Sequence, residues 1–140
     1  YPDDHNRQKA VAAAFQTASA VRFDSCAGAI DGILIWMTKP TNPHCAEAGV
    51  RPKNFLCGRK HKYGLNCQAV SDCRGRFLDI SMRYGGATAD CIAFEASDLF
   101  QHLQSNVLAP GLVLFGDNAY VNSSFMATPF PNVRAGSKDN

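Results

Sequence analysis

Two aspartates occupy positions in this sequence where an isolated carboxylate would be costly. Asp31 interrupts the almost wholly apolar run of residues 28–37, and Asp117 follows the apolar run of residues 112–115. A carboxylate beside buried strands is expensive to desolvate unless it binds something. Carboxylate oxygens suit Mg²⁺ or Mn²⁺, and such ions promote phosphodiester cleavage by activating water and neutralising charge on the leaving oxygen. Taken together, the two acids favour a metal site.

Each aspartate also has an ordinary structural explanation. Asp31 could shape a turn with its neighbour Gly32, and Asp117 could be a turn aspartate before Asn118. For a single residue these explanations are the commoner ones. The metal interpretation therefore depends on a fold that brings the two acids together.

The order of the expected elements would bring them together. Apolar residues at helical spacing predict helices over residues 6–21 and 90–104. Apolar and β-branched runs predict strands over residues 28–37, 63–70, 76–83 and 112–115, the middle two as a hairpin. Three consecutive strands, a crossover helix and a fourth strand parallel to the first are the order of an RNase H-like α/β domain with a mixed sheet. Neighbouring strands lie about 4.8 Å apart, so Asp31 and Asp117 could share one cation.

The remaining segments have less regular patterns. Residues 41–59 combine turn residues with basic residues, which predicts an exposed loop, and residues 118–140 contain no closing element. Five aromatic residues in apolar patterns are expected in the core: Trp36, Phe77, Phe94, Phe100 and Phe115.

Six cysteines are scattered through the chain. A chain of 140 residues with 46% hydrophobic residues can build its own core. Free buried thiols are therefore expected, in place of the disulfides of a small secreted domain. A zinc site is the alternative, with ligands from His44, Cys45, Cys57 and His61, but the paired C-x-x-C spacing of a structural zinc site is absent.

A cluster of basic residues precedes the expected strand that begins at Tyr63. The net charge is only +2, yet no acidic residue occurs within residues 48–71. The candidate DNA contacts in this stretch are Lys53, Arg59, Lys60 and Lys62. Such a run is commonly a solvated loop, but its place beside the expected site favours contact with DNA phosphates. Phe55 and Tyr63 could stack on bases, although core packing is the commoner role for both.

The chain as a whole is expected to form a single domain over residues 1–140. No run approaches the roughly 20 apolar residues of a membrane helix, and the first residues do not resemble a signal peptide. We therefore expect a soluble, intracellular protein.

Four sequence blocks resemble motifs of Harbinger-type DDE endonucleases, a family of transposases. They are Ala-Ile-Asp-Gly at 29–32, the stretch 63–72, Gly-Gly-Ala-Thr-Ala-Asp at 85–90 and Gly-Asp-Asn-Ala-Tyr at 116–120. Each block is short, but four blocks in the same order and at similar spacing form a specific signal.

The resemblance implies a role for each acid. Asp31 and Asp117 correspond to the first two catalytic acids, and Asp90 to an auxiliary acid, for which a helix N-cap is an equal alternative. The family places its third acid, a glutamate, on a later helix, whereas no Glu follows Glu95 here. The chain is therefore expected to be truncated before the last catalytic helix and to be inactive alone. The Thr-His pair that many relatives carry after the first Asp-Gly is replaced by Ile-Leu at 33–34.

The implied function is metal-dependent hydrolysis of DNA phosphodiester bonds with two Mg²⁺ or Mn²⁺ ions. The complete protein would be an endonuclease or transposase that acts on DNA in the nucleus. A separate partner protein could supply recognition of DNA, because the sequence lacks a helix-turn-helix module. The alternative is a domesticated, non-catalytic DNA-binding or structural subunit of a larger assembly, since a fold does not fix a function.

Overall fold

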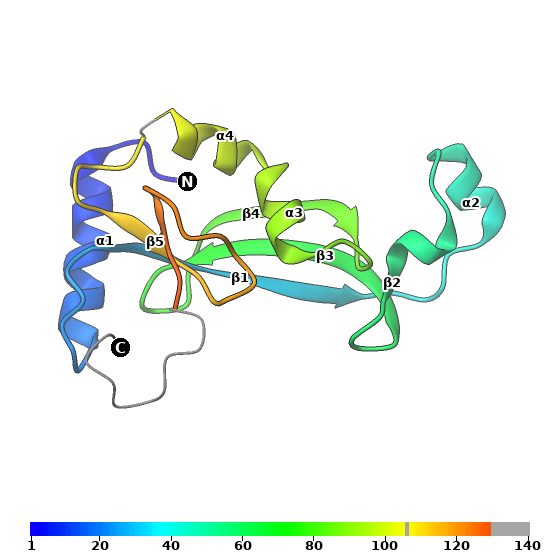
Figure 1. Cartoon of the computed structure of the whole chain (residues 1–140), viewed down its shortest axis with the longest axis horizontal. Coiled ribbons are helices and arrows are strands. Elements are labelled where there is room, and N and C mark those ends of the chain that lie inside the picture. Colours follow the sequence, from blue (N-terminus) through cyan, green and yellow to red (C-terminus); the bar gives the residue numbers. More distant parts are fainter. Residues whose placement is uncertain (106, 130–140) are drawn as a thin grey trace.

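The computed structural model describes residues 1–105 and 107–129, and these residues form a mixed α/β domain (Figure 1). The helices are α1 (His5–Ala18), α2 (Asn42–Glu47), the 3₁₀-helix η1 (Pro52–Phe55), α3 (Asp90–Glu95) and α4 (Asp98–Gln104). The strands are β1 (Cys26–Trp36), β2 (Leu56–Cys57), β3 (Lys62–Ser71), β4 (Phe77–Gly85), β5 (Val113–Phe115) and β6 (Met126–Ala127).

Within the described residues, the strands form one mixed sheet of six. The order is β2-β3-β1-β5-β6, and β4 also pairs with β3. β1 runs antiparallel to β3 and parallel to β5, and β3 runs antiparallel to β4. A mixed sheet with helices in this arrangement fits the expected RNase H-like class.

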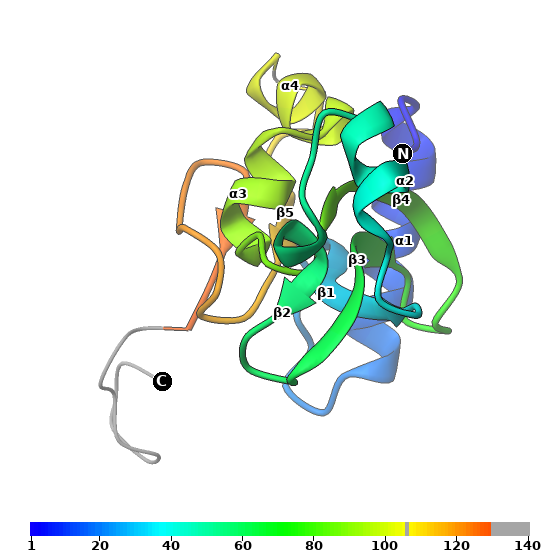
Figure 2. The same ribbon diagram turned by 90° about the vertical axis from the view of Figure 1, so that its right-hand side faces the viewer.

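The helices cover only part of the sheet. Figure 1 shows α3 and α4 together on one side of the sheet, and α1 at the end where β1 begins. In the view from the opposite end, α3 and α1 lie on different sides of β1 and β3 (Figure 2). The far ends of β1 and β3 extend beyond these helices toward α2. Side chains at those far ends therefore have less of the protein to pack against.

Two helices differ from the sequence-based expectation at their ends. The helix expected over residues 6–21 ends at Ala18, after starting from the N-cap Asp4, whose carboxylate accepts hydrogen bonds from the backbone N–H groups of Asn6 and Arg7. The single helix expected over residues 90–104 is wrong: it is two helices. Ser97 separates them, because its side chain accepts a hydrogen bond from the Phe100 N–H at 3.1 Å and so starts α4.

The segment expected to be an exposed loop over residues 41–59 is largely exposed, but it is not irregular, because it contains α2, η1 and β2. Pro43 lies in the first turn of α2 and Pro52 in the first turn of η1. Proline is well tolerated there, since the first N–H groups of a helix have no intrahelical acceptor. The prolines that suggested a loop therefore mark helix starts.

The stretch 118–140, expected to lack a closing element, contains β6, and residues 130–140 lie outside the described residues.

The core lies between the sheet and the α3–α4 pair. It is built from apolar side chains of the central strands and both helices, among them Ile30, Val70, Phe94, Leu103 and Leu114. Phe94 packs edge-on against two further aromatic rings, at centroid distances of 5.3 Å and 5.8 Å. Such edge-to-face pairs add stabilisation beyond the buried area.

Two aromatic residues expected in this core are on the surface. Trp36 is 65% exposed and Phe77 is 60% exposed, whereas Phe94 is buried and Phe100 and Phe115 are half-buried. Trp36 is the last residue of β1, in the part of the strand that extends past α3. An apolar pattern predicts burial only where another layer covers the strand.

The turn between β3 and β4 is organised by Asp72. Its carboxylate accepts hydrogen bonds from the backbone N–H groups of Arg74 and Arg76, at 2.9 Å and 3.0 Å, and from the Arg76 side chain at 2.8 Å. The hydrogen bond from the Arg76 backbone is the main reason that the pKa of Asp72 lies below its ordinary value. The ionised carboxylate thus stabilises the hairpin.

Asp72→Asn is expected to lower the free energy of unfolding at neutral pH and to lose this effect in acid. Because the pKa of Asp72 is lower in the folded chain than in the unfolded chain, its contribution is complete above about pH 4. It is lost as the pH falls through the folded pKa. Urea unfolding of both proteins from pH 7 downward measures the difference. A difference that does not change with pH would contradict this account.

All six cysteines are free, as expected: three are buried and three are half-buried. Among the described residues, no helix combines the length and apolar character needed to cross a membrane.

Candidate active site

Asp31 lies in the middle of β1, two residues beyond the last residue of this strand that pairs with β5. Its partner in β3 is Ala69, and its own side chain is exposed. The Oδ1 atom accepts a hydrogen bond from the Gly32 N–H at 2.7 Å. The carboxylate is therefore oriented by the strand backbone but accessible to a ligand.

Asp117 follows the neighbouring strand β5. Ala29 of β1 is paired with Phe115 of β5 in the parallel ladder. Asp31 and Asp117 each come two residues after this pair, Asp31 within β1 and Asp117 beyond the end of β5, so both acids lie just past the point where the two strands are paired. The Asp117 Oδ1 accepts a hydrogen bond from the Ala119 N–H at 2.8 Å, in the turn that leaves the strand.

Asp90 approaches the site from α3. It is the first residue of the helix, while Ala89 is the N-cap, so the N-cap interpretation of Asp90 is wrong. Its Oδ1 accepts hydrogen bonds from the side-chain amides of Asn66 (2.9 Å) and Gln68 (3.0 Å). The carboxylate fills the space above Gly32, where any side chain would overlap it. Glycine at position 32 leaves the space on this face of β1 that the Asp90 carboxylate occupies.

A buried polar network holds Asp90 in this position. Tyr120 donates a hydrogen bond to the Gln68 Oε1 at 2.6 Å, and the Gln68 amide donates to Asn66 at 2.7 Å as well as to Asp90. Asn66 also donates to the Thr88 carbonyl at 3.0 Å. All buried side-chain polar atoms of the described residues have partners. A fully paired network of this kind is rigid.

The sequence-based assignment missed Asn66, Gln68 and Tyr120. A signal was present, because Asn66 and Gln68 are alternate polar residues within a largely apolar strand. Alternate residues share a face, and Val70 places that face in the core. Two buried amides on one face require specific partners.

Burial and negative charge both act on the Tyr120 hydroxyl. The pKa of Tyr120 is raised, first by burial and then by the negative charges of Asp90, Asp31 and Asp117. In each of these aspartates, the hydrogen bonds between described residues reach only Oδ1. The Oδ2 atoms remain available to a cation. Among residues 1–105 and 107–129, however, no three His, Cys, Asp or Glu side chains form a complete metal-binding cluster.

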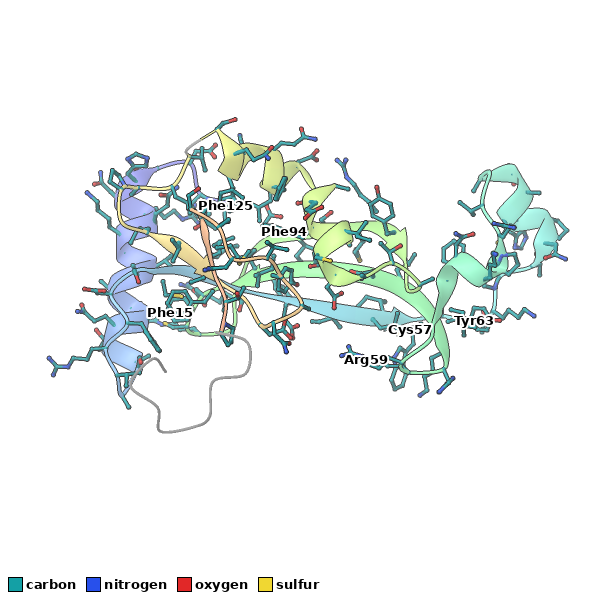
Figure 3. The ribbon with its side chains drawn as sticks, viewed as in Figure 1. Phe15, Cys57, Arg59, Tyr63, Phe94 and Phe125 are labelled. Atoms are coloured by element: carbon teal, nitrogen blue, oxygen red, sulfur yellow. The ribbon has the colours of Figure 1, made fainter. Side chains whose placement is uncertain are left out.

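Of the four basic candidates for DNA contact, two lie at this site. A pocket of about 240 Å³ is lined by Asp90, Asn66, Gly32, Arg59 and Lys60, together with residues around them. Figure 3 shows Arg59 with Cys57 and Tyr63 at the end of the sheet opposite to Phe15.

The other two basic candidates lie elsewhere. Lys62 stands over the Trp36 ring, with its Nζ 3.4 Å from the ring centroid. Lys53 is an exposed residue of η1 and does not line the pocket. Phe55 and Tyr63 are both half-buried.

Comparison with known proteins connects this arrangement to one family. A family model described as DDE superfamily endonuclease matches residues 30–140, which include Asp31, Asp90 and Asp117. No curated protein and no solved structure matches the chain.

Proposed function

Because this chain belongs to the DDE superfamily endonucleases, we propose that it forms part of the catalytic domain of a transposase-like nuclease that hydrolyses DNA phosphodiester bonds. Endonucleases of this superfamily typically use divalent metal ions. The observation that carries the proposal is the position of Asp31 and Asp117 just beyond the paired residues Ala29 and Phe115 of two adjacent parallel strands. Asp90 is held over Gly32, in the same strand as Asp31.

Within this superfamily, we propose that the chain is of the Harbinger type. In this proposal, each of the four blocks that resemble Harbinger motifs contributes residues to the site. The first contributes Asp31 and the third Asp90, the fourth contributes Asp117, and the second contributes the supporting amides Asn66 and Gln68. Motifs separated in sequence but adjacent in space support a shared function over chance similarity.

Asp31 and Asp117 would be the principal ligands for Mg²⁺ or Mn²⁺, and Asp90 an auxiliary one. The donor set fits these ions, since carboxylate oxygens are the ligands that both prefer. When bound, a pair of such ions lowers the pKa of water and neutralises charge on the leaving oxygen. The residues of this chain hold and orient the ligands: the strand backbone fixes Asp31, and the Asn66–Gln68 amides fix Asp90.

DNA would reach the acids along the basic end of the sheet. Arg59 and Lys60 line the pocket that leads to Asp90, and their charges would neutralise backbone phosphates. Lys62 and Lys53 would contact the DNA farther from the acids. We further propose that the protein acts in the nucleus, with a separate DNA-binding protein that selects the target.

The proposal is tested by calorimetric titration of the chain with Mn²⁺. The parent is expected to bind, and the double variant Asp31→Asn, Asp117→Asn to bind at least about tenfold more weakly, because loss of a ligand costs no less than loss of an outer-shell partner. Asp98→Asn is the matched control. Asp98 is an exposed acid on α4 that is paired with Arg83, so its replacement should leave Mn²⁺ binding unchanged.

Circular dichroism establishes that each variant is folded. Equal Mn²⁺ affinity of parent and folded double variant would refute the assignment of Asp31 and Asp117. Absence of Mn²⁺ binding by the folded parent would instead favour the non-catalytic, domesticated alternative.

A further inference from the structure

Trp36 is an exposed tryptophan with a lysine on one face of its ring. It is the last residue of β1, and 65% of it is exposed. The Lys62 Nζ lies 3.4 Å from the ring centroid, in a cation–π contact. Lys62 covers one face of the Trp36 ring, so we infer from the 65% exposure that the other face is open to solvent. Single exposed apolar residues are common on protein surfaces, but a ring held by a cation on one face presents its other face in a fixed orientation.

Trp36 lies on the face of the sheet that carries Asp90. Gly32, directly below Asp90, and Trp36 are four residues apart in β1, and residues separated by an even number share a face. The rise of a strand makes this distance about 13 Å. Phosphates of one duplex strand are about 3.4 Å apart along the axis. A few nucleotides of one DNA strand can therefore reach from Asp90 to Trp36.

The surroundings of Trp36 are basic. Arg59 and Lys60 belong to the turn between β2 and β3, next to Lys62. No acidic residue occurs within residues 48–71. The charge complements a polyanion, and the open aromatic face complements a nucleobase, which is the combination found in binding sites for single-stranded nucleic acid.

We propose that Trp36 is a stacking platform for an unpaired base of the DNA strand whose phosphates run past Lys62, Arg59 and Lys60 toward Asp90. This proposal rests on the proposed nuclease function for the identity of the strand. Bases within an intact duplex are already stacked on their neighbours, so the platform selects DNA that is single-stranded or locally opened at this position.

The experiment uses the fact that Trp36 is the only tryptophan in the chain. Its fluorescence is recorded during titration with an oligothymidylate of eight nucleotides and with a hairpin duplex of similar charge, without divalent ions. The single strand is expected to quench Trp36 at concentrations at which the duplex does not. Fluorescence anisotropy of a labelled octathymidylate then gives the affinities of variants.

Trp36→Leu is expected to weaken octathymidylate binding by about fivefold or more, because stacking of one base contributes that much, whereas Trp36→Phe should retain part of the affinity. Phe77→Leu is the matched control, since Phe77 is also an exposed aromatic residue, 60% exposed, with arginines beside it. It pairs with Ser71, at the opposite end of β3 from Gly64, the partner of Trp36. Trp36 projects into solvent, so circular dichroism should show an unchanged fold.

Two results would overturn the proposal: quenching that is equal for duplex and single strand, or unchanged octathymidylate affinity in folded Trp36→Leu. The same titration of the Asp31→Asn, Asp117→Asn variant separates this proposal from the nuclease proposal. In this double variant the single strand should still quench Trp36, because base stacking on Trp36 requires no carboxylate. The same quenching is expected even if the parent chain does not bind Mn²⁺.

Discussion

Alanine in place of Gly32 is expected to reduce Mn²⁺ affinity by about 10- to 100-fold, the range observed when outer-shell support of a metal ligand is lost. A methyl group at position 32 would overlap the Asp90 carboxylate, which must then leave the amides of Asn66 and Gln68. Because both amides are buried, loss of their acceptor also costs about 1–3 kcal/mol of stability. Calorimetry with Mn²⁺ and urea unfolding measure the two effects.

Two further variants make the Gly32 test specific. Gly58→Ala is the control for a general effect of glycine replacement, because no atom lies within 4 Å of the position that its methyl group would occupy. In an Asp90→Ala background the clash is absent, so Gly32→Ala should then have little additional effect on stability. Equal losses in both backgrounds would show that position 32 acts through something other than Asp90.

Leu114→Ala is expected to destabilise the domain by about 2–5 kcal/mol. Leu114 is fully buried at the centre of β5, where it pairs with Gly28 of β1 and Met126 of β6. Removing its side chain leaves a cavity in the core that β1 and β5 cover. Urea denaturation measures the loss of free energy.

The exposed residue Ile92, which is 54% exposed on α3, provides the control for Leu114. Ile92→Ala should change the free energy of unfolding by about 0.5 kcal/mol or less, as is usual for surface positions. A comparable loss from both substitutions would mean that β5 is not part of the stabilising core.

The sequence indicates the candidate acids more readily than the residues that support them. Asp31 and Asp117 were identifiable because each follows or interrupts an apolar strand. The position of Asp90 over Gly32 could not be predicted from the sequence. It brings the start of a helix against a distant strand, and it depends on the absence of a side chain at Gly32. Nothing in the local pattern of either segment indicates that distant pairing.

Burial at the ends of strands was the second feature that the sequence pattern could not predict. Trp36 continues the apolar alternation of β1, so its pattern resembles that of Ile30 or Leu34, yet it is exposed. Whether a strand residue is covered depends on the length of the helices above it, which alternation does not record. The turn residues of segment 41–59 led to a different error, in secondary structure. Pro43 and Pro52 suggested a loop, whereas each lies in the first turn of a short helix.

The long antiparallel pairing of β1 with β3 restricts how this domain can vary in length. The ladder runs from Ala29 opposite Ser71 to Trp36 opposite Gly64. One residue inserted into β1 would invert every later side chain, so that core and surface positions exchange. The segment 37–61 has no such constraint, because lengthening a surface connection costs little free energy. Homologous chains should therefore vary in length between the two strands and keep the length of β1 constant.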